Sequence, residues 1–306
     1  MEKLYVNKIV IHEVGLRDGL QIEKAVVPTE QKIRWAGELI SSGVDIVQLG
    51  SFVNPDKVPQ MADTEKLFAH FLQPGKKPES VVLSGLVLNE KGLDRGLACG
   101  VELLCMGVSA SDTHSRKNTG MSTAEATGRI LAMARKAVES GKKVQVSVQS
   151  AFGCGYEGAV PSERVLDLAR RFLDAGLKTV SLADTAGHAT PDRIERLFGA
   201  IFEMDSAVQC ACHLHDTYGF AMANACAALR AGVASFDAAF AGLGGCPFTA
   251  VTGGNLCTED FVHLLHKMDT RQDISLERLS AVSLDASRFF QRALPGRVHR
   301  TGPIPR

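Results

Sequence analysis

The sequence predicts an α/β fold of the (β/α)8 type, a TIM barrel with a short additional C-terminal helical segment. Three observations favour it. Strand-like and helical patterns alternate eight times, glycines mark the helix ends, and no G-x-G-x-x-G segment opens a helix after the first strand. With 306 residues, 45% of them hydrophobic, the chain can bury one large core. We therefore expect a single domain over residues 1–306, with residues from about 275 to 306 as a C-terminal extension.

Eight apolar or β-branched runs are expected to form the strands, at residues 8–14, 45–51, 81–87, 101–108, 143–149, 178–183, 208–215 and 235–241. A helical pattern follows each run. Several of these helices are expected to end at a glycine in the left-handed C′ position, namely Gly43, Gly100, Gly141, Gly176 and Gly232. Two helices are expected to begin at a hydroxyl N-cap, Thr190 before Pro191 and Ser162 before Glu163.

The last part of the chain is expected to add one helix around Leu276–Gln291. Residues 294–300 are basic and rich in proline and glycine. They could form a mobile flap over the barrel, but an exposed surface tail is the favoured interpretation.

Composition excludes several classes of partner. Acidic and basic residues cancel, 34 against 34, which argues against nucleic acid or an anionic membrane as the main partner. No apolar run has the character of a signal peptide or the length of a membrane span. The eight cysteines include no C-x-x-C pair and are typical of core thiols in a reducing compartment. The expected location is the cytoplasm.

The seventh expected strand carries a histidine pair. His213 and His215 occupy alternate positions, so both imidazoles project from the same face of the strand. Two histidines buried in the core would give the same pattern. Because the pair is followed at once by the polar run DTYG, we favour half of a metal site.

Other reactive side chains are expected at the same rim of the barrel, where strands end and βα loops begin. The first strand ends in EVGLRDGLQ (13–21), in which Gly15 and Gly19 are expected to let the backbone turn sharply around Arg17 and Asp18. A loop ion pair is the alternative interpretation of that pair. The eighth strand leads to a glycine loop with one thiol and then to Asn255. Asp18, His213, His215 and Asn255 would offer mixed nitrogen and oxygen ligands, which suit Mg²⁺ or Mn²⁺.

These segments together resemble a known family. EVGLRDGLQ (13–21), HLHDTYG (213–219) and GLGGCP (242–247) are similar to signatures of 3-hydroxy-3-methylglutaryl-CoA (HMG-CoA) lyase. That family belongs to a metal-dependent group that also contains isopropylmalate and homocitrate synthases. Further similarity lies at SFV (51–53), VPQM (58–61), GCGYEG (153–158), DTAG (184–187) and GNLCTED (254–260). The resemblance thus extends in order to about residue 269.

The resemblance implies an activity and a role for each matching residue. It implies a carbon–carbon lyase that cleaves an acyl-CoA, HMG-CoA above all, to acetyl-CoA and acetoacetate, and it implies a homodimer. Asp18, His213, His215 and Asn255 would bind the metal, Arg17 would face the thioester oxygen, and Cys246 would transfer a proton. Around them, the residues expected to contact the substrate or support the ligands are Gln48, Asp184, Tyr156, Lys24 and Glu259.

The chain also departs from the family pattern. Gln48 stands where the lyases have glutamate, Ile22 where they usually have asparagine, and Leu16 where they usually have proline. With Leu49 and Gly50, these positions are expected to lie at the rim of the pocket. Their changes would favour a group at C3 larger or more apolar than methyl.

Three other functions fit parts of the pattern. A condensing acyltransferase of the isopropylmalate synthase type would share the barrel, but such enzymes usually carry a further C-terminal domain. An amidohydrolase also uses an H-x-H motif, normally on the first strand of the barrel. A non-catalytic binding module would not need Arg17, Asp18, both histidines and Cys246 together.

Overall fold

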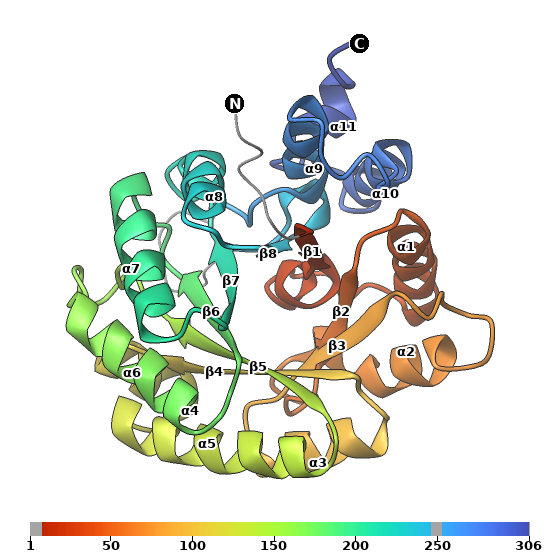
Figure 1. Ribbon diagram of the computed structural model, residues 1–306. Helices are drawn as coiled ribbons and strands as arrows, with labels where there is room; N and C mark the ends of the chain where they lie inside the picture. The colour runs from red at the N-terminus through yellow and green to blue at the C-terminus, as the bar shows by residue number, and fades with distance from the viewer. Residues whose placement is uncertain (1–7, 246–252, 306) are drawn as a thin grey trace.

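The computed structural model describes residues 8–245 and 253–305. Within them, eight parallel strands close into a barrel in the order β1 to β8, each hydrogen-bonded to its sequence neighbours and β8 to β1 (Figure 1). The predicted (β/α)8 barrel is therefore confirmed. The strands are β1 (Val10–Glu13), β2 (Ile46–Ser51), β3 (Val82–Leu86), β4 (Leu103–Ser109), β5 (Lys143–Gln149), β6 (Thr179–Asp184), β7 (Gln209–Leu214) and β8 (Ser235–Ala238).

Helices surround the barrel and cover the outer face of the strands (Figure 1). The strands are buried almost throughout, and the buried residues include polar side chains such as His12, Gln48 and Asp237. The helices are α1 (Thr29–Ser41), α2 (Thr64–Phe71), α3 (Glu90–Ala98), α4 (Asp112–Thr119), α5 (Thr123–Glu139), α6 (Ser162–Asp174), α7 (Pro191–Met204), α8 (Ala221–Arg230), α9 (Thr258–Lys267), α10 (Leu276–Phe289) and α11 (Val298–Thr301). Three short helical turns complete them, η1 (Gly15–Gly19), η2 (Pro59–Met61) and η3 (Phe240–Gly242).

The predicted helix ends are partly confirmed. All five glycines expected at helix C-termini have φ between 74° and 95°, the left-handed region that favours glycine. Thr190 is the N-cap of α7, although its hydroxyl donates to Asp192 rather than capping a backbone amide. The expectation for Ser162 is wrong by one residue, because Pro161 occupies the N-cap position and Ser162 is the first residue of α6.

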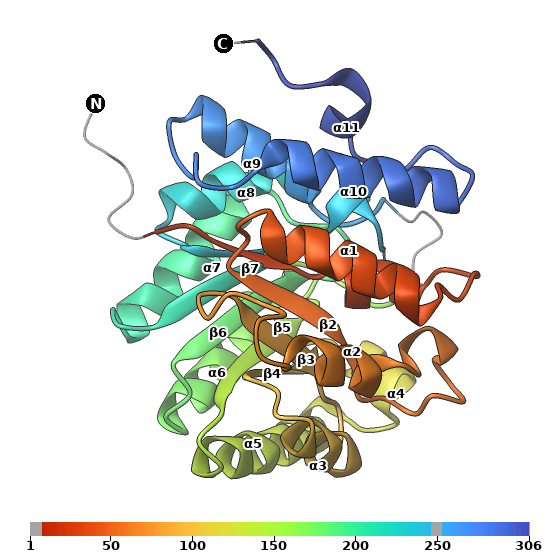
Figure 2. The ribbon, with the colours of Figure 1, turned by 90° about the vertical axis from the view of Figure 1, so that its right-hand side faces the viewer.

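The C-terminal segment packs against the barrel instead of forming an exposed tail. α10 lies across α1 and beside α9 (Figure 2), close to the predicted 276–291. Residues 294–300 were expected at the surface, but Leu294 is 1% exposed and Val298 is 8% exposed. The amide of Gly296 also donates to the carbonyl of Ala241, at 2.9 Å. The segment is therefore anchored to the turn that follows β8. Within the described residues no helix combines the length and apolarity needed to cross a membrane.

A candidate metal centre at the mouth of the barrel

A pocket of about 240 Å³ lies at the carboxyl ends of the strands. The barrel rule places reactive groups at this end, and the side chains here come from η1 and from strands on every side of the barrel. Its lining includes Arg17, Asp18, Gln48, Gln145, His213, His215 and Asp237. The structure therefore gathers, at one place, residues that are up to 220 positions apart in the sequence.

Arg17 and Asp18 are presented by η1, a single π-helical turn. The amides of Arg17 and Asp18 both donate to the carbonyl of Val14, at 3.0 and 2.7 Å. The backbone turns here as expected, but neither Gly15 nor Gly19 has a positive φ. They are needed for close approach instead. A Cβ on Gly15 would lie 2.7 Å from the carboxylate of Glu13, and one on Gly19 would lie 2.9 Å from Leu243.

The two histidines converge with Asp18 on one point. The Nε2 atoms of His213 and His215 lie 3.2 Å apart. The Oδ2 atom of Asp18 lies 3.5 Å from the Nε2 of His215 and 3.8 Å from that of His213. Three potential ligand atoms thus face a common centre from two different elements. This convergence is the arrangement that a cation requires.

The Nδ1 atoms of the two imidazoles, which point away from the common centre, each contact an oxygen atom. The Nδ1 of His215 lies 2.8 Å from the carbonyl oxygen of Thr185, and the Nδ1 of His213 lies 3.1 Å from Asp237. Because a carbonyl can only accept, the Nδ1 of His215 carries a hydrogen, and its Nε2 keeps a lone pair directed at the centre. Metal-ligating histidines are typically oriented in this way.

Asp18 is a carboxylate at neutral pH. Burial raises its pKa, but the charge of Arg17 and the neighbouring histidines outweigh burial and hold the pKa well below its ordinary value. Conversely, burial lowers the pKa of His215, but the hydrogen bond and charge of Asp18 outweigh it and raise that pKa. Asp18 therefore offers a carboxylate oxygen beside the two imidazoles.

Asn255 supplies a free carbonyl oxygen. Its Nδ2 donates to Asp18 at 2.8 Å and to the carbonyl of Leu243 at 2.9 Å. Because both partners are acceptors, the amide orientation is determined. The Oδ1 atom is buried and has no hydrogen-bond partner among the described residues. A buried acceptor without a partner is costly, and the amide that carries it lies beside Asp18 through the Nδ2 contact.

Gln48 holds the guanidinium of Arg17. The Nε of Arg17 donates to the side-chain oxygen of Gln48, and an Nη donates to Asp18. Of the five departures expected at the pocket rim, Gln48 is the one that lines the pocket. Leu16 and Leu49 are buried in the hydrophobic core, and Gly50 faces Thr64. The expectation that all five positions reshape the pocket is therefore wrong.

Asp184 faces away from the pocket. Its neighbours Ala183 and Thr185 line the pocket, and strand alternation turns Asp184 to the other side. There it accepts the amides of His188 and Ala189, at 2.8 and 3.1 Å. Burial raises the pKa of its carboxyl above the ordinary value. Asp184 thus orders the loop after β6, and its charge raises the pKa of His215, which fits the expected support of a ligand.

Tyr156 and Lys24 lie outside the pocket lining. Tyr156 is 38% exposed on the loop after β5, where the ammonium of Lys117 lies 4.5 Å from its ring centroid. Lys24 is exposed. Cys246 lies outside the described residues, but Gly245 before it lines the pocket. The described part of the glycine loop thus reaches the pocket.

A second group of candidate metal ligands consists of Cys257, Glu259 and Asp260. Its carboxylates already have partners. Glu259 contacts the Nδ1 of His299 at 2.8 Å and accepts the amide of Ala241 at 3.0 Å. Asp260 accepts hydrogen bonds from the backbone amides of Arg297 and Val298. Glu259 therefore connects the C-terminal segment to the turn after β8, and does not line the pocket.

His12, Glu13 and Asp237 are functional candidates that the sequence analysis did not single out. His12 and Asp237 are buried inside the barrel, and Asp237 lines the pocket beside His213. The sequence did contain a signal for them, because each is an ionisable residue within a strand. His12 and Glu13 follow Val10 and Ile11 in β1, and Asp237 lies between Phe236 and Ala238 in β8. Such a residue is rarely buried without a partner.

Glu13 gives the protein a pH-dependent stability. Its carboxyl accepts the amides of Gly15 and Phe240, at 2.7 and 3.1 Å, and so joins η1 to the turn after β8. Burial raises its pKa from 4.5 to about 8, against these hydrogen bonds, which lower it. The folded pKa lies above the unfolded pKa, so the contribution to stability is fully present below pH 4.5 and is lost as the pH rises towards 8.

We expect the melting temperature of the wild type to fall between about pH 5 and about pH 8, and that of Glu13→Gln to fall less, since the amide has no proton to lose. Thermal unfolding followed by circular dichroism at several pH values measures this. Parallel pH profiles for the two proteins would show that Glu13 does not titrate in this range.

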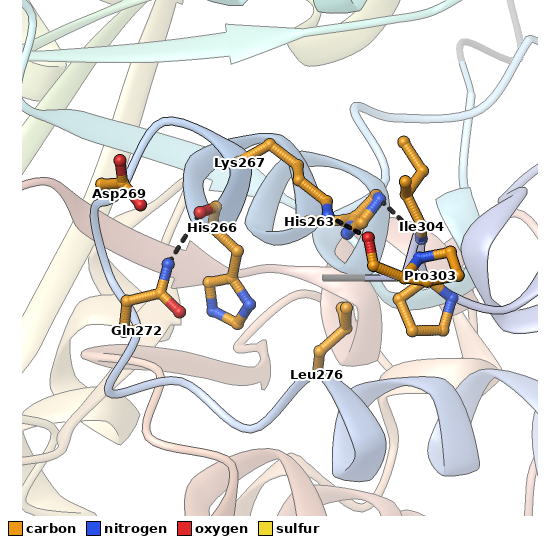
Figure 3. Close-up of a pocket in the computed structure, with 9 residues that line it drawn as sticks. His263, His266, Lys267, Asp269, Gln272, Leu276, Pro303 and Ile304 are labelled. Carbon is orange, nitrogen blue, oxygen red and sulfur yellow. Dashed lines mark hydrogen bonds between the residues drawn. The ribbon is translucent and has the colours of Figure 1, made fainter.

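A larger pocket, of about 770 Å³, lies away from the strand ends. It is formed by α9, the turn after it and the C-terminal residues 303–305, which meet around His263 and Ile304 (Figure 3). The amide of Ile304 donates to His263 at 3.3 Å, and Lys267 donates to a carbonyl of the same C-terminal stretch at 3.2 Å. Its side chains do not converge on a free acceptor set, so we assign the chemistry to the barrel mouth.

Comparison with known proteins agrees with that assignment. The HMGL-like family model matches residues 8–285. The hydroxymethylglutaryl-CoA lyase YngG of Bacillus subtilis is 35% identical over 96% of this chain and 97% of its own. The (R)-citramalyl-CoA lyase of Chloroflexus aurantiacus is 34% identical over 98% of this chain and 96% of its own.

The fold also matches a solved structure closely. An HMG-CoA lyase from Acinetobacter baumannii, determined in complex with coenzyme A and 3-methylmalate, superposes with a TM-score of 0.90 at 32% sequence identity. The superposition covers 97% of this chain and 98% of that chain. Similarity in both sequence and structure thus extends over nearly the whole length.

Proposed function

This chain belongs to the HMGL-like family, and we propose that it cleaves HMG-CoA to acetyl-CoA and acetoacetate. It is a carbon–carbon lyase, as its relatives are. The observation that carries the proposal is the convergence of Asp18, His213 and His215 beside the free Oδ1 of Asn255, with Arg17 next to them.

The family depends on a divalent metal, and we propose Mg²⁺ or Mn²⁺ for this chain. Asp18, His213, His215 and Asn255 would hold it. When bound, the cation supplies a Lewis acid that binds oxygens of the substrate. A donor set of oxygen and imidazole without thiolate supports the choice of these two metals.

The remaining chemistry belongs to the side chains of the protein. A general base takes the proton of the tertiary 3-hydroxyl, the electron pair left on that oxygen forms the carbonyl at C3, and the C2–C3 bond breaks with its electron pair delocalised into the thioester as an enolate. Arg17 would face the thioester oxygen, where its fixed charge stabilises the negative charge as it develops. We assign the return of a proton to the enolate carbon to Cys246, on the glycine loop. The products are then the keto acid and acetyl-CoA.

A second candidate substrate has specific support. Gln48 lines the pocket where the HMG-CoA lyase pattern has glutamate, and one full-length relative is a citramalyl-CoA lyase. A related 3-hydroxyacyl-CoA with a different substituent at C3 would use the same ligands and the same Arg17. The metal centre is common to both candidates, and the substituent at C3 is what separates them.

We expect the purified protein, supplied with Mn²⁺ or Mg²⁺, to release acetyl-CoA and acetoacetate in equal amounts from HMG-CoA. Mass spectrometry of both products measures this, with citramalyl-CoA and longer C3-alkyl analogues as parallel substrates. A higher kcat/KM for one of those compounds than for HMG-CoA would identify that compound as the preferred substrate. Release of neither product from any of them would contradict the lyase assignment, and condensation of acetyl-CoA with a keto acid would favour the acyltransferase alternative.

We also propose the partners of the protein and its location. An acyl-CoA is the proposed substrate, and a homodimer is expected from the resemblance, for which light scattering of the purified protein is the test. The seven described cysteines are free thiols, which supports a reducing compartment such as the cytoplasm. Some relatives are mitochondrial, so the source of the chain bears on this point.

A further inference from the structure

A chain of buried polar side chains runs beneath the pocket. The Nε2 of His12 lies 2.7 Å from the hydroxyl of Ser84, and its Nδ1 lies 3.0 Å from Oδ1 of Asp237. The other oxygen of Asp237 lies 3.1 Å from the Nδ1 of His213. The order is therefore Ser84, His12, Asp237, His213, and we call this series the interior chain. It ends on a proposed metal ligand.

The fold places the members of the interior chain side by side. β7, β8 and β1 are neighbours in the barrel (Figure 1), and their register pairs Asp237 with His213 on one side and with His12 on the other. The three side chains thus share one level inside the barrel. His12 is 0% exposed and Asp237 is 6% exposed, so bulk water cannot replace either contact.

The interior chain also continues towards Arg17. Ser84 and Gln48 both lower the pKa of the Cys105 thiol against the effect of burial, and Gln48 accepts a hydrogen bond from Arg17. Burial raises the pKa of Cys105 to about 12, so it remains a neutral thiol. Cys105, Gln48 and Arg17 line the same pocket as Asp237 and His213.

Asp237 needs a second contact to do its work on His213. A carboxylate can rotate about its side-chain bonds, and a single 3.1 Å contact leaves that rotation free. His12 approaches the oxygen that His213 does not use. The contact is close enough for an ion pair but too oblique for a good hydrogen bond.

We propose that His12 is a positioning residue of the metal centre, which acts through Asp237 to fix the imidazole of His213. The proposal rests on the proposed function, because it takes His213 to be a metal ligand. With the Nδ1 of His213 directed at Asp237, the Nε2 is left to face the cation. Supporting contacts of this kind typically change metal affinity by about 10- to 100-fold.

The test is Mn²⁺ binding by the substrate-free protein, measured by electron paramagnetic resonance of the unbound ion. We expect His12→Leu, which is similar in volume and cannot contact Asp237, to raise the Kd about tenfold or more. His12→Asn places its amide nitrogen near the position of Nδ1, so its Kd is expected to stay within about threefold of the wild type. His12→Gln reaches towards Ser84 rather than Asp237, and is expected to bind as weakly as His12→Leu.

Two further measurements exclude a general effect on folding. Ser181→Ala removes a buried hydroxyl from β6, outside the interior chain, and should leave the Kd unchanged. Asp237→Asn should weaken binding by itself, and adding His12→Leu to it should cost little more, because both act through one contact. Additive losses would place His12 on a separate route and overturn the proposal.

The remaining outcomes are equally decisive. Wild-type affinity in His12→Leu, or equal loss in His12→Asn and His12→Leu, would show that His12 only fills space. Failure of the wild type itself to bind Mn²⁺ would overturn the metal centre and the role of His12 with it. Normal wild-type binding with unaffected His12 variants would overturn the role of His12 alone, so the two failures are distinguishable.

Discussion

The His213→Ala protein should fold, bind no divalent metal at stoichiometric level, and turn over at least about a thousandfold more slowly than the wild type. The expected size follows from the geometry. His213 supplies one of the three atoms that face the centre, 3.2 Å from the Nε2 of His215 and 3.8 Å from Asp18. Removing it leaves Asp18 and His215 as the two remaining members of this group of three. A cation contributes several kcal/mol to the stabilisation of developing charge, and its loss accounts for the thousandfold change.

Metal content by mass spectrometry, together with turnover, measures this expectation. Asp18→Asn should behave in the same way, since it keeps the volume and loses the charge. His263→Ala is a matched control, because His263 is a histidine of α9 in the separate pocket near the C-terminus. Full activity of His213→Ala, or of the wild type after chelation, would contradict the metal centre.

Much of the fold could be predicted because its signals are local. Alternating strand and helix patterns with glycine after each helix depend on neighbouring residues, and the structure confirms the barrel. The proximity of His213, His215 and Asp18 also followed from a general rule, since strand ends meet at one rim. These signals predict where in the fold a side chain lies, but they do not predict which atoms it contacts.

The contacts that local patterns could not give are those set by register and packing. The approach of His12 to Asp237 depends on how β1 pairs with β8, more than 200 residues later. Gly15 is required by the side chains packed against η1 and not by its own φ. Residues 294–300 were expected to form an exposed tail because most of them are polar, proline or glycine. In the structure Leu294 and His299 are buried, and His299 contacts Glu259 on α9.

The position of Gln48 bears on how Arg17 works. A glutamate at position 48 would place a second carboxylate on the guanidinium, which already donates to Asp18. Gln48 accepts the Nε hydrogen and adds no negative charge. Arg17 therefore keeps more of its positive charge available for the substrate than a guanidinium between two carboxylates would.

Arg17→Met should lower kcat by about a hundredfold to a thousandfold while changing the Mn²⁺ affinity by less than about tenfold. Arg17 contacts Asp18 and Gln48 but does not face the centre with a ligand atom, so the metal site should survive its removal. What is lost is the fixed charge beside the enolate oxygen. Interactions made chiefly in the transition state lower kcat, whereas interactions made equally with the bound substrate change KM.

Arg17→Lys separates charge from geometry. Lysine keeps the positive charge but cannot donate to Gln48 and Asp18 with one planar group, so the direction of the charge is no longer fixed. If a fixed direction matters, Arg17→Lys should recover little of the kcat that Arg17→Met loses. Steady-state kinetics with both variants, together with Mn²⁺ titration, decides the matter. A large rise in KM with unchanged kcat would show that Arg17 binds the substrate and not the transition state. Loss of metal in both variants would show that Arg17 acts chiefly by positioning the carboxylate of Asp18, and not by stabilising charge on the thioester.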